Sequence, residues 1–182
     1  MAVEQFRAFF ACDRCGERYA SKPWRSYYLD VSTEPPRKIA VQSRVAWCDA
    51  EQTVVTAERY QSPESSSGML DFMVEHRAHG MAAPSGKELA FFRMLLELSE
   101  RRESPPRCLG CGSLEFEYLV DESGRTSTVE HPRCGGVIRS VGLLLGGWDA
   151  PPERYYSTEG IRIDDLAAIE RAVLIDVDHE DC

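Results

Sequence analysis

Two short pairs of cysteine and histidine in the second half of the chain have the spacing of a metal site. Two residues separate Cys108 from Cys111 and His131 from Cys134, and nineteen residues lie between the pairs. A two-residue gap lets the backbone curl so that both donor atoms point at one ion, and three thiolates with one imidazole form a tetrahedral zinc set. A glycine follows each pair and supplies the positive φ that such a curl needs. The spacing therefore predicts one zinc, or an iron, held by these four residues.

A Cys-x-x-Cys pair can also be a redox centre, as in thioredoxin-like proteins. In those folds the pair follows a strand and begins a helix. Here residues 114–120 follow the pair, with Leu114, Phe116, Tyr118 and Val120 on one face of a strand and Glu115 and Glu117 on the other. That alternation is typical of a strand and favours a metal site over a redox pair or buried free thiols.

The first third of the chain carries a second set of thiols. Cys12 and Cys15 have the same two-residue gap, and Cys48 follows after thirty-two residues. We expect these three thiols to lie together, because an apolar strand at 39–47 can pair with one at 6–11. They would hold a second zinc if a fourth ligand completes the site.

Several residues are candidates for that fourth ligand. Glu51 stands at Cys-x-x spacing from Cys48, as if it replaced the second cysteine of a pair. The other candidates are Asp49, His76, His79 and His179. Each histidine could equally be an ordinary helix-surface residue, and the thiols could be a decayed site held by apolar packing. A further alternative joins Cys12–Cys15 and Cys108–Cys111 around one ion and leaves Cys48, His131 and Cys134 for another role.

Composition limits the class of protein. A length of 182 residues suits one ordinary domain or two small ones. There is no apolar run of twenty residues that would cross a membrane, and the first residues do not read as a secretory signal. Because the seven cysteines mostly fall at metal spacing in a chain without an export signal, we expect reduced thiols and a cytoplasmic location.

The net charge of −9 is concentrated near the C-terminus. Residues 149–182 hold three basic and ten acidic side chains, whereas the rest of the chain is nearly neutral. A nucleic-acid-binding protein normally presents a basic face, so nucleic acid is a disfavoured partner. Another protein with a basic surface is the partner that this charge favours.

The periodicity predicts an α+β fold in four segments. These are a β-rich segment at 1–61, a helical hairpin at 62–107, a metal-bearing β module at 108–148, and an acidic segment at 149–182 with a short helix near 163–173 and a tail from 176, all of which can pack as one domain. The second helix of the hairpin, near 87–102, is expected to bury Leu89, Phe92, Leu95 and Leu96.

The metal motifs resemble the zinc-ribbon fold group. Cys108-x-x-Cys111 and His131-x-x-Cys134 look like its two knuckles, and Cys12-x-x-Cys15 with Cys48 looks like a worn version. The resemblance implies antiparallel β modules clasped by zinc on either side of the helical hairpin. Zinc ribbons occur in transcription factors, ribosomal proteins, enzyme appendages and adaptors, so the resemblance does not imply one function.

We therefore expect a non-enzymatic, zinc-stabilised binding or adaptor protein, of the kind found among bacterial immunity proteins and complex subunits. The sequence has no phosphate-binding glycine loop, no Gly-x-Ser-x-Gly and no His-Glu-x-x-His. One alternative is a nucleic-acid-associated zinc ribbon, with Arg125, Arg133 and Arg139 meeting phosphates. Another is a zinc enzyme, in which the thiols of the first third hold a zinc-bound water and Glu51 acts as general base.

Overall fold

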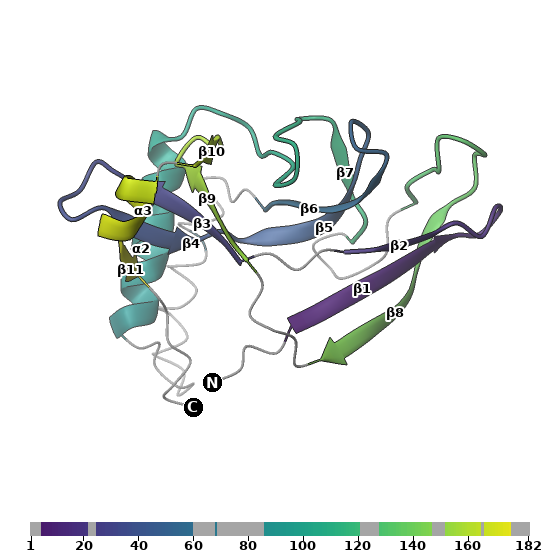
Figure 1. The fold of residues 1–182 in the computed structure, drawn as a ribbon, viewed down its shortest axis with the longest axis horizontal. Helices are drawn as coiled ribbons and strands as arrows, with labels where there is room; N and C mark the ends of the chain where they lie inside the picture. The colour runs from purple at the N-terminus through teal and green to yellow at the C-terminus, as the bar shows by residue number, and fades with distance from the viewer. Residues whose placement is uncertain are drawn as a thin grey trace. The chain divides into compact units, whose positions relative to one another are not determined.

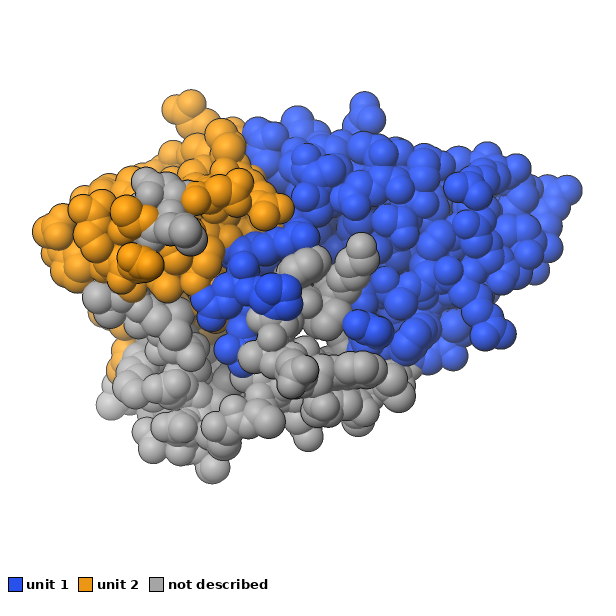
Figure 2. All heavy atoms as spheres, viewed as in Figure 1, with its two compact units in different colours: residues 1–26, 41–59, 105–154 blue, residues 27–40, 60–104, 155–182 orange. Residues whose placement is uncertain are grey.

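A computed structural model describes residues 5–21, 25–59, 68, 86–120, 128–146, 152–164 and 166–175. The described chain is mostly strands with few helices, which confirms a mixed α and β composition. It forms two compact units that alternate along the sequence (Figure 2): Met1–Ser26, Val41–Arg59 and Pro105–Arg154 form the first, and Tyr27–Ala40, Tyr60–Ser104 and Tyr155–Cys182 form the second. No helix among the described residues is long and apolar enough to cross a membrane.

The first unit contains a three-stranded antiparallel sheet in the order β2-β1-β8 (Figure 1). Its strands are β1 (Gln5–Cys12), β2 (Arg18–Ala20) and β8 (Ile138–Gly146). β1 and β2 form a hairpin, and β8 runs antiparallel along the other edge of β1 with Ile138 opposite Cys12. The end of β1 therefore lies beside the start of β8.

A second three-stranded sheet in the same unit repeats this plan, in the order β6-β5-β7. Its strands are β5 (Ser43–Cys48), β6 (Thr53–Glu58) and β7 (Phe116–Tyr118). β5 and β6 form the hairpin, and β7 runs antiparallel to β5 with Phe116 opposite Cys48. Each sheet is thus a hairpin whose first strand also pairs with a third strand from much later in the sequence.

The strand predicted at 39–47 is two strands. β4 (Arg37–Ala40) belongs to the sheet of the second unit, and β5 begins at Ser43 after a break. The predicted pairing of this segment with 6–11 is wrong, because both edges of β1 are occupied by β2 and β8. The strand predicted at 6–11 is confirmed as β1.

β5 is buried on both faces and links two apolar clusters. Trp47 points into one cluster, and its neighbours Ala46 and Cys48 point into the other, as the two-residue period of a strand requires. The ring of Trp47 meets that of Tyr19 edge to face at 5.2 Å. The first cluster consists of Ala8, Phe10, Tyr19, Trp47, Val54, Leu119, Val129 and Ile138.

The second unit is built mainly from a five-stranded sheet and two helices. The sheet has the order β10-β9-β3-β4-β11. Besides β4, its strands are β3 (Arg25–Asp30), β9 (Glu153–Ser157), β10 (Arg162–Ile163) and β11 (Val173–Ile175), and the helices are α2 (Gly86–Arg101) and α3 (Leu166–Arg171). α3 is shorter than the predicted helix at 163–173, because Ile163 and Val173 lie in strands.

α2 has nearly the predicted bounds but buries a rotated face. Its buried apolar residues recur at helical spacing and are Phe91, Met94, Leu95 and Leu98. Only Leu95 was predicted for that face, since Leu89, Phe92 and Leu96 are half-buried. The predicted first helix of the hairpin and the tail from 176 lie outside the described residues.

A buried carboxylate ties the end of α2 to β3 within the second unit. Arg101 forms an ion pair with Asp30 at 3.1 Å, and the backbone N–H of Ser32 donates to the same carboxylate at 3.0 Å. Burial alone would raise the pKa of Asp30, but the hydrogen bonds from Ser32 and Arg101 outweigh it and lower this pKa.

Candidate metal centres

Four loops of the first unit share one backbone pattern, in which two potential ligands stand three positions apart. In three of them the residue after the second ligand is a glycine with positive φ, namely Gly16, Gly112 and Gly135. Its N–H donates to the carbonyl of the first ligand at 2.8–3.0 Å in each case. In the fourth loop, Cys48–Glu51, the same position is Gln52 with φ of 51°. A non-glycine residue seldom adopts this φ, so Cys48–Glu51 shares the backbone conformation of the other three loops and is a fourth knuckle, with Glu51 as its second potential ligand.

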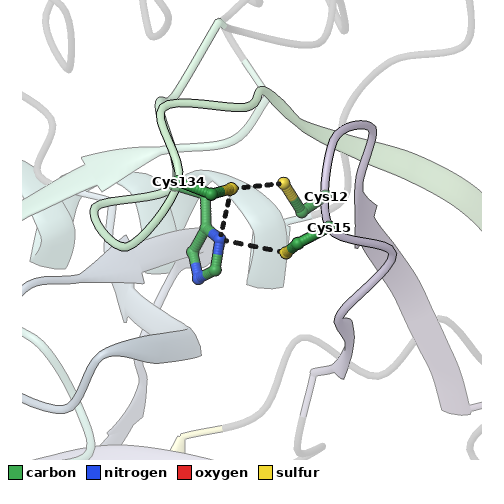
Figure 3. A group of neighbouring side chains, drawn as sticks. Cys12, Cys15 and Cys134 are labelled. Carbon is green, nitrogen blue, oxygen red and sulfur yellow. Dashed lines mark hydrogen bonds between the residues drawn. The ribbon is translucent and has the colours of Figure 1, made fainter.

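Pairing of β1 with β8 brings two of these knuckles together. The knuckle that leaves β1 carries Cys12 and Cys15, and the knuckle that enters β8 carries His131 and Cys134. Figure 3 shows the side chains of Cys12, Cys15 and Cys134 converging from these two loops. One donor atom from each of the four residues lies within 4.8 Å of all the others. We call this group the Cys12 site.

The spacing of donor atoms in the Cys12 site fits a zinc-sized ion. The sulfurs of Cys12 and Cys134 are 3.4 Å apart, and Nδ1 of His131 lies 3.4 Å from the sulfur of Cys15 and 3.2 Å from that of Cys134. In a tetrahedron the ligands are about 1.6 bond lengths apart, so zinc–sulfur and zinc–nitrogen bonds of about 2.3 and 2.0 Å give separations of about 3.5–3.8 Å. The three measured separations are within a few tenths of an ångström of these values, and every other pair of donors lies within 4.8 Å.

His131 is held from its far side so that Nδ1 faces the sulfurs. Its side chain is 2% exposed, and Nε2 lies 2.9 Å from the Tyr19 hydroxyl and 3.5 Å from a carboxylate oxygen of Glu17. The ring also meets Trp47 edge to face at 5.9 Å. Burial, followed by the charge of Glu17, raises the pKa of Tyr19 to about 12. Such partners fix the orientation of a ligating imidazole and strengthen it as a donor.

The Cys12 loop favours the thiolate form of Cys12, and the two loops of the Cys12 site approach each other closely. The backbone N–H of Cys15 is the main cause that lowers the pKa of Cys12 to about 6, and thiolate is the form that binds metal. A Cβ atom built at Gly136 would lie 2.6 Å from the sulfur of Cys12 and 2.5 Å from Cβ of Arg14. The absence of a side chain at Gly136 therefore lets the two knuckles meet.

Pairing of β5 with β7 brings the other two knuckles together in the same way. Cys48 and Glu51 leave β5, while Cys108 and Cys111 precede β7. The sulfurs of Cys48 and Cys111 are 3.6 Å apart, and Oε1 of Glu51 lies 3.3 Å from the sulfur of Cys108. Donor atoms of all four residues lie within 4.8 Å of one another. We call this group the Cys48 site.

The two sites repeat each other in their backbone hydrogen bonds. The N–H of Asp13 donates to Val137, just before β8, and the N–H of Asp49 donates to Glu115, just before β7. We call the knuckles that follow β1 and β5 outgoing and those that precede β8 and β7 incoming. In each incoming knuckle, the N–H of the first potential ligand donates to the carbonyl five residues later, from His131 to Gly136 and from Cys108 to Ser113. Cys12–Cys15 thus corresponds to Cys48–Glu51, and His131–Cys134 to Cys108–Cys111.

Two thiols of the Cys48 site, Cys108 and Cys111, are less acidic than Cys12. Burial is the largest cause that raises the pKa of Cys108 and also that of Cys111. A backbone N–H from Gly110 to the sulfur of Cys108, at 3.3 Å, opposes this effect without cancelling it. Because metal binds the thiolate, loading of this site releases protons.

The structure corrects the partners predicted for each ligand. The predicted tetrad Cys108, Cys111, His131 and Cys134 is divided between the two sites, and Cys48 does not join Cys12 and Cys15. Strand pairing determines which knuckles share a site. A knuckle precedes β8 and another precedes β7, and antiparallel pairing places these knuckles beside the ends of β1 and β5. The alternative in which Cys12–Cys15 and Cys108–Cys111 share one ion is also wrong, because the structure places these two pairs in different sites.

Glu51 is the fourth ligand candidate that the structure places beside Cys48. Asp49 instead accepts a hydrogen bond from the indole N–H of Trp47 at 3.0 Å, and His76, His79 and His179 lie outside the described residues. One sequence signal could have revealed the correct partners. Both outgoing knuckles begin Cys-Asp at the end of an apolar strand, whereas neither incoming knuckle does.

No known protein family, curated protein or solved structure matches this chain in sequence or structure comparisons. What the chain can do is therefore read from its own residues. Those residues form two Cys-rich clusters that can hold metal ions, and their donors and spacing suit zinc.

Proposed function

We propose that the protein is a non-enzymatic binding protein whose first unit consists of two interleaved zinc ribbons, each holding one zinc. The observation that carries this proposal is the repeated plan of a hairpin, a third strand and two facing knuckles around four donors. The ribbon built on β5 lies within the sequence span of the ribbon built on β1.

The donor count supports a structural role for the metal. Four protein ligands close a tetrahedral zinc, whereas a catalytic zinc keeps one position for water or substrate. Sheets of only three strands bury little apolar surface, and a structural zinc would supply the cross-link that they lack. The enzyme alternative required Cys12, Cys15 and Cys48 around one zinc, and these sulfurs lie in two different groups.

Charge supports a protein partner. The net charge of −9 suits electrostatic steering toward a basic surface. Two arginines proposed for nucleic-acid contact have acidic neighbours instead, since Arg133 lies 3.5 Å from Glu17 and Arg139 lies 3.1 Å from Asp13. The third, Arg125, lies outside the described residues. The nucleic-acid alternative is therefore the weaker one.

Metal analysis and binding assays on the full chain test the proposal. Protein purified under reducing conditions should carry two zinc ions per chain. It should retain a basic protein partner from its native host in a salt-sensitive manner and should not retain nucleic acid. Stable protein without zinc or iron would overturn the metal part of the proposal, and salt-sensitive retention of nucleic acid in place of a protein would overturn the partner.

A further inference from the structure

We infer that the Cys48 site is a reversible site for a thiophilic divalent cation and that Glu51 is the ligand that lets the ion leave. The Cys12 site is the permanent one. This inference rests on the proposed function, because it requires both sites to bind zinc. It adds a distinction between them, in which one ion holds the fold and the other exchanges with its surroundings.

The donor sets of the two sites differ in one type of donor. Each site has three sulfurs, and the fourth donor is the imidazole of His131 in the Cys12 site and the carboxylate of Glu51 in the Cys48 site, although these two residues do not occupy corresponding positions in the knuckles. Thiolates are the soft ligands that zinc retains best, and a carboxylate oxygen is a harder donor. Glu51 is therefore the weakest of the four bonds in its site.

His131 and Glu51 also differ in their exposure to solvent. His131 is buried, and Tyr19 and Trp47 hold it from behind, so it cannot swing away without disturbing the core. Glu51 is exposed, and a carboxylate that moves into water does not incur the cost of an unpaired buried charge. Release through Glu51 therefore leaves the apolar clusters intact.

A surface pocket gives access at Glu51. It has a volume of about 100 Å³, and its wall includes Glu51, Thr53, Gly110 and Arg154. The guanidinium of Arg154 donates to the carbonyl of Leu109 at 3.0 Å, which places a positive charge beside the Cys108 knuckle. The pocket thus offers an entry for a small anionic chelator or competing donor at the position that Glu51 vacates.

Gly110 controls whether the carboxylate can reach the site. A Cβ atom at this position would lie 2.0 Å from Oε1 of Glu51 and 3.0 Å from its Cδ. Gly110→Ala should therefore push the carboxylate away. It keeps all three sulfur ligands and the backbone N–H that faces Cys108. This variant perturbs the Glu51 contact without replacing a ligand.

Release of zinc from the fully loaded chain to an excess of a chromogenic anionic chelator tests the inference. Wild type should release its two ions in two phases of equal amplitude. Cys15→Ser should remove the slow phase and Cys111→Ser the fast one. Glu51→Cys completes a four-thiolate set and should slow the fast phase by about tenfold or more, while Gly110→Ala and Glu51→Gln should accelerate it.

The matched control is Glu117→Gln, which removes an exposed carboxylate from β7 in the same sheet and should leave both phases unchanged. Cobalt substitution gives a second readout, because Glu51→Cys should intensify the thiolate-to-metal absorption of one site only. Two ions released at one rate, or a fast phase indifferent to both Glu51→Cys and Gly110→Ala, would overturn the inference. Failure of the wild type to bind two zinc ions when zinc is supplied in excess would instead overturn the proposed function.

Discussion

Paired ligand substitutions and zinc counting test which knuckles share an ion. The structure places Cys15 and Cys134 in one site and Cys111 in the other. Each single Cys→Ser variant should therefore retain one zinc of two. The double variant Cys15→Ser/Cys134→Ser should still retain one, because both changes damage the same site. The double variant Cys111→Ser/Cys134→Ser should retain none.

Stability should follow the same pattern. Structural zinc contributes on the order of 10–16 kcal/mol of apparent binding free energy in small peptides, so the second change within a damaged site adds little to the loss. A change in the other site removes the second ion as well. Zinc per chain is measured by native mass spectrometry on freshly purified protein, and the free energy of unfolding by denaturant titration.

The opposite pattern would refute this grouping. If Cys111 and Cys134 shared one ion, as their positions in the sequence first indicate, their double variant would keep one zinc and Cys15→Ser/Cys134→Ser would keep none. Cobalt titration of variants purified without metal guards against loss of zinc by partial unfolding, because each intact site should still develop its thiolate absorption.

Three further changes, two of them paired with a control variant, probe the packing and one buried charge. Gly136→Ala should cost about 1–3 kcal/mol and weaken zinc at the Cys12 site, because its Cβ would overlap the sulfur of Cys12. Gly142→Ala, which meets nothing within 4 Å, should not weaken that zinc in the same metal and denaturation assays. Leu98→Ala should cost about 2–5 kcal/mol on denaturation, and Leu96→Ala less, because only Leu98 is buried. Asp30→Asn should destabilise the fold near neutral pH. The difference in stability between the variant and the wild type should vanish on acidification, because the lowered pKa of Asp30 contributes stability that is lost as pH falls through this pKa. A difference that persists in acid would contradict this prediction.

Local patterns predicted individual elements better than their arrangement. The apolar run at 6–11 placed β1, and helical periodicity placed α2 within one residue at each end. The buried face of α2 was misjudged because Phe91, Leu95 and Leu98 make as regular an apolar stripe as Leu89, Phe92 and Leu96. The sheet against which a helix packs decides between such stripes, and a local pattern contains no information about it.

The ligand types were predicted, and Glu51 could be named from its spacing, but the ligands were assigned to the wrong partners. Adjacent knuckles in the sequence suggested one hairpin-sized site around Cys111 and His131. The structure instead uses each of these knuckles to enter a strand that pairs with an earlier hairpin. Such long-range pairing depends on which edges of β1 and β5 remain open after their hairpins form.

Loop-closure entropy explains why proximity in sequence was a weak guide. Cys111 and His131 are twenty positions apart, whereas Cys12 and Cys134 are 122 apart. Because closure entropy grows as about 1.5RT times the logarithm of loop length, the roughly sixfold longer loop costs only about 2 kcal/mol more. A structural zinc contributes several times that amount, and the strand pairs that bring the knuckles together add to it. The arrangement in which one ribbon lies within the sequence span of the other is therefore accessible to this chain, and the pairing of β8 with β1 and of β7 with β5 determines it.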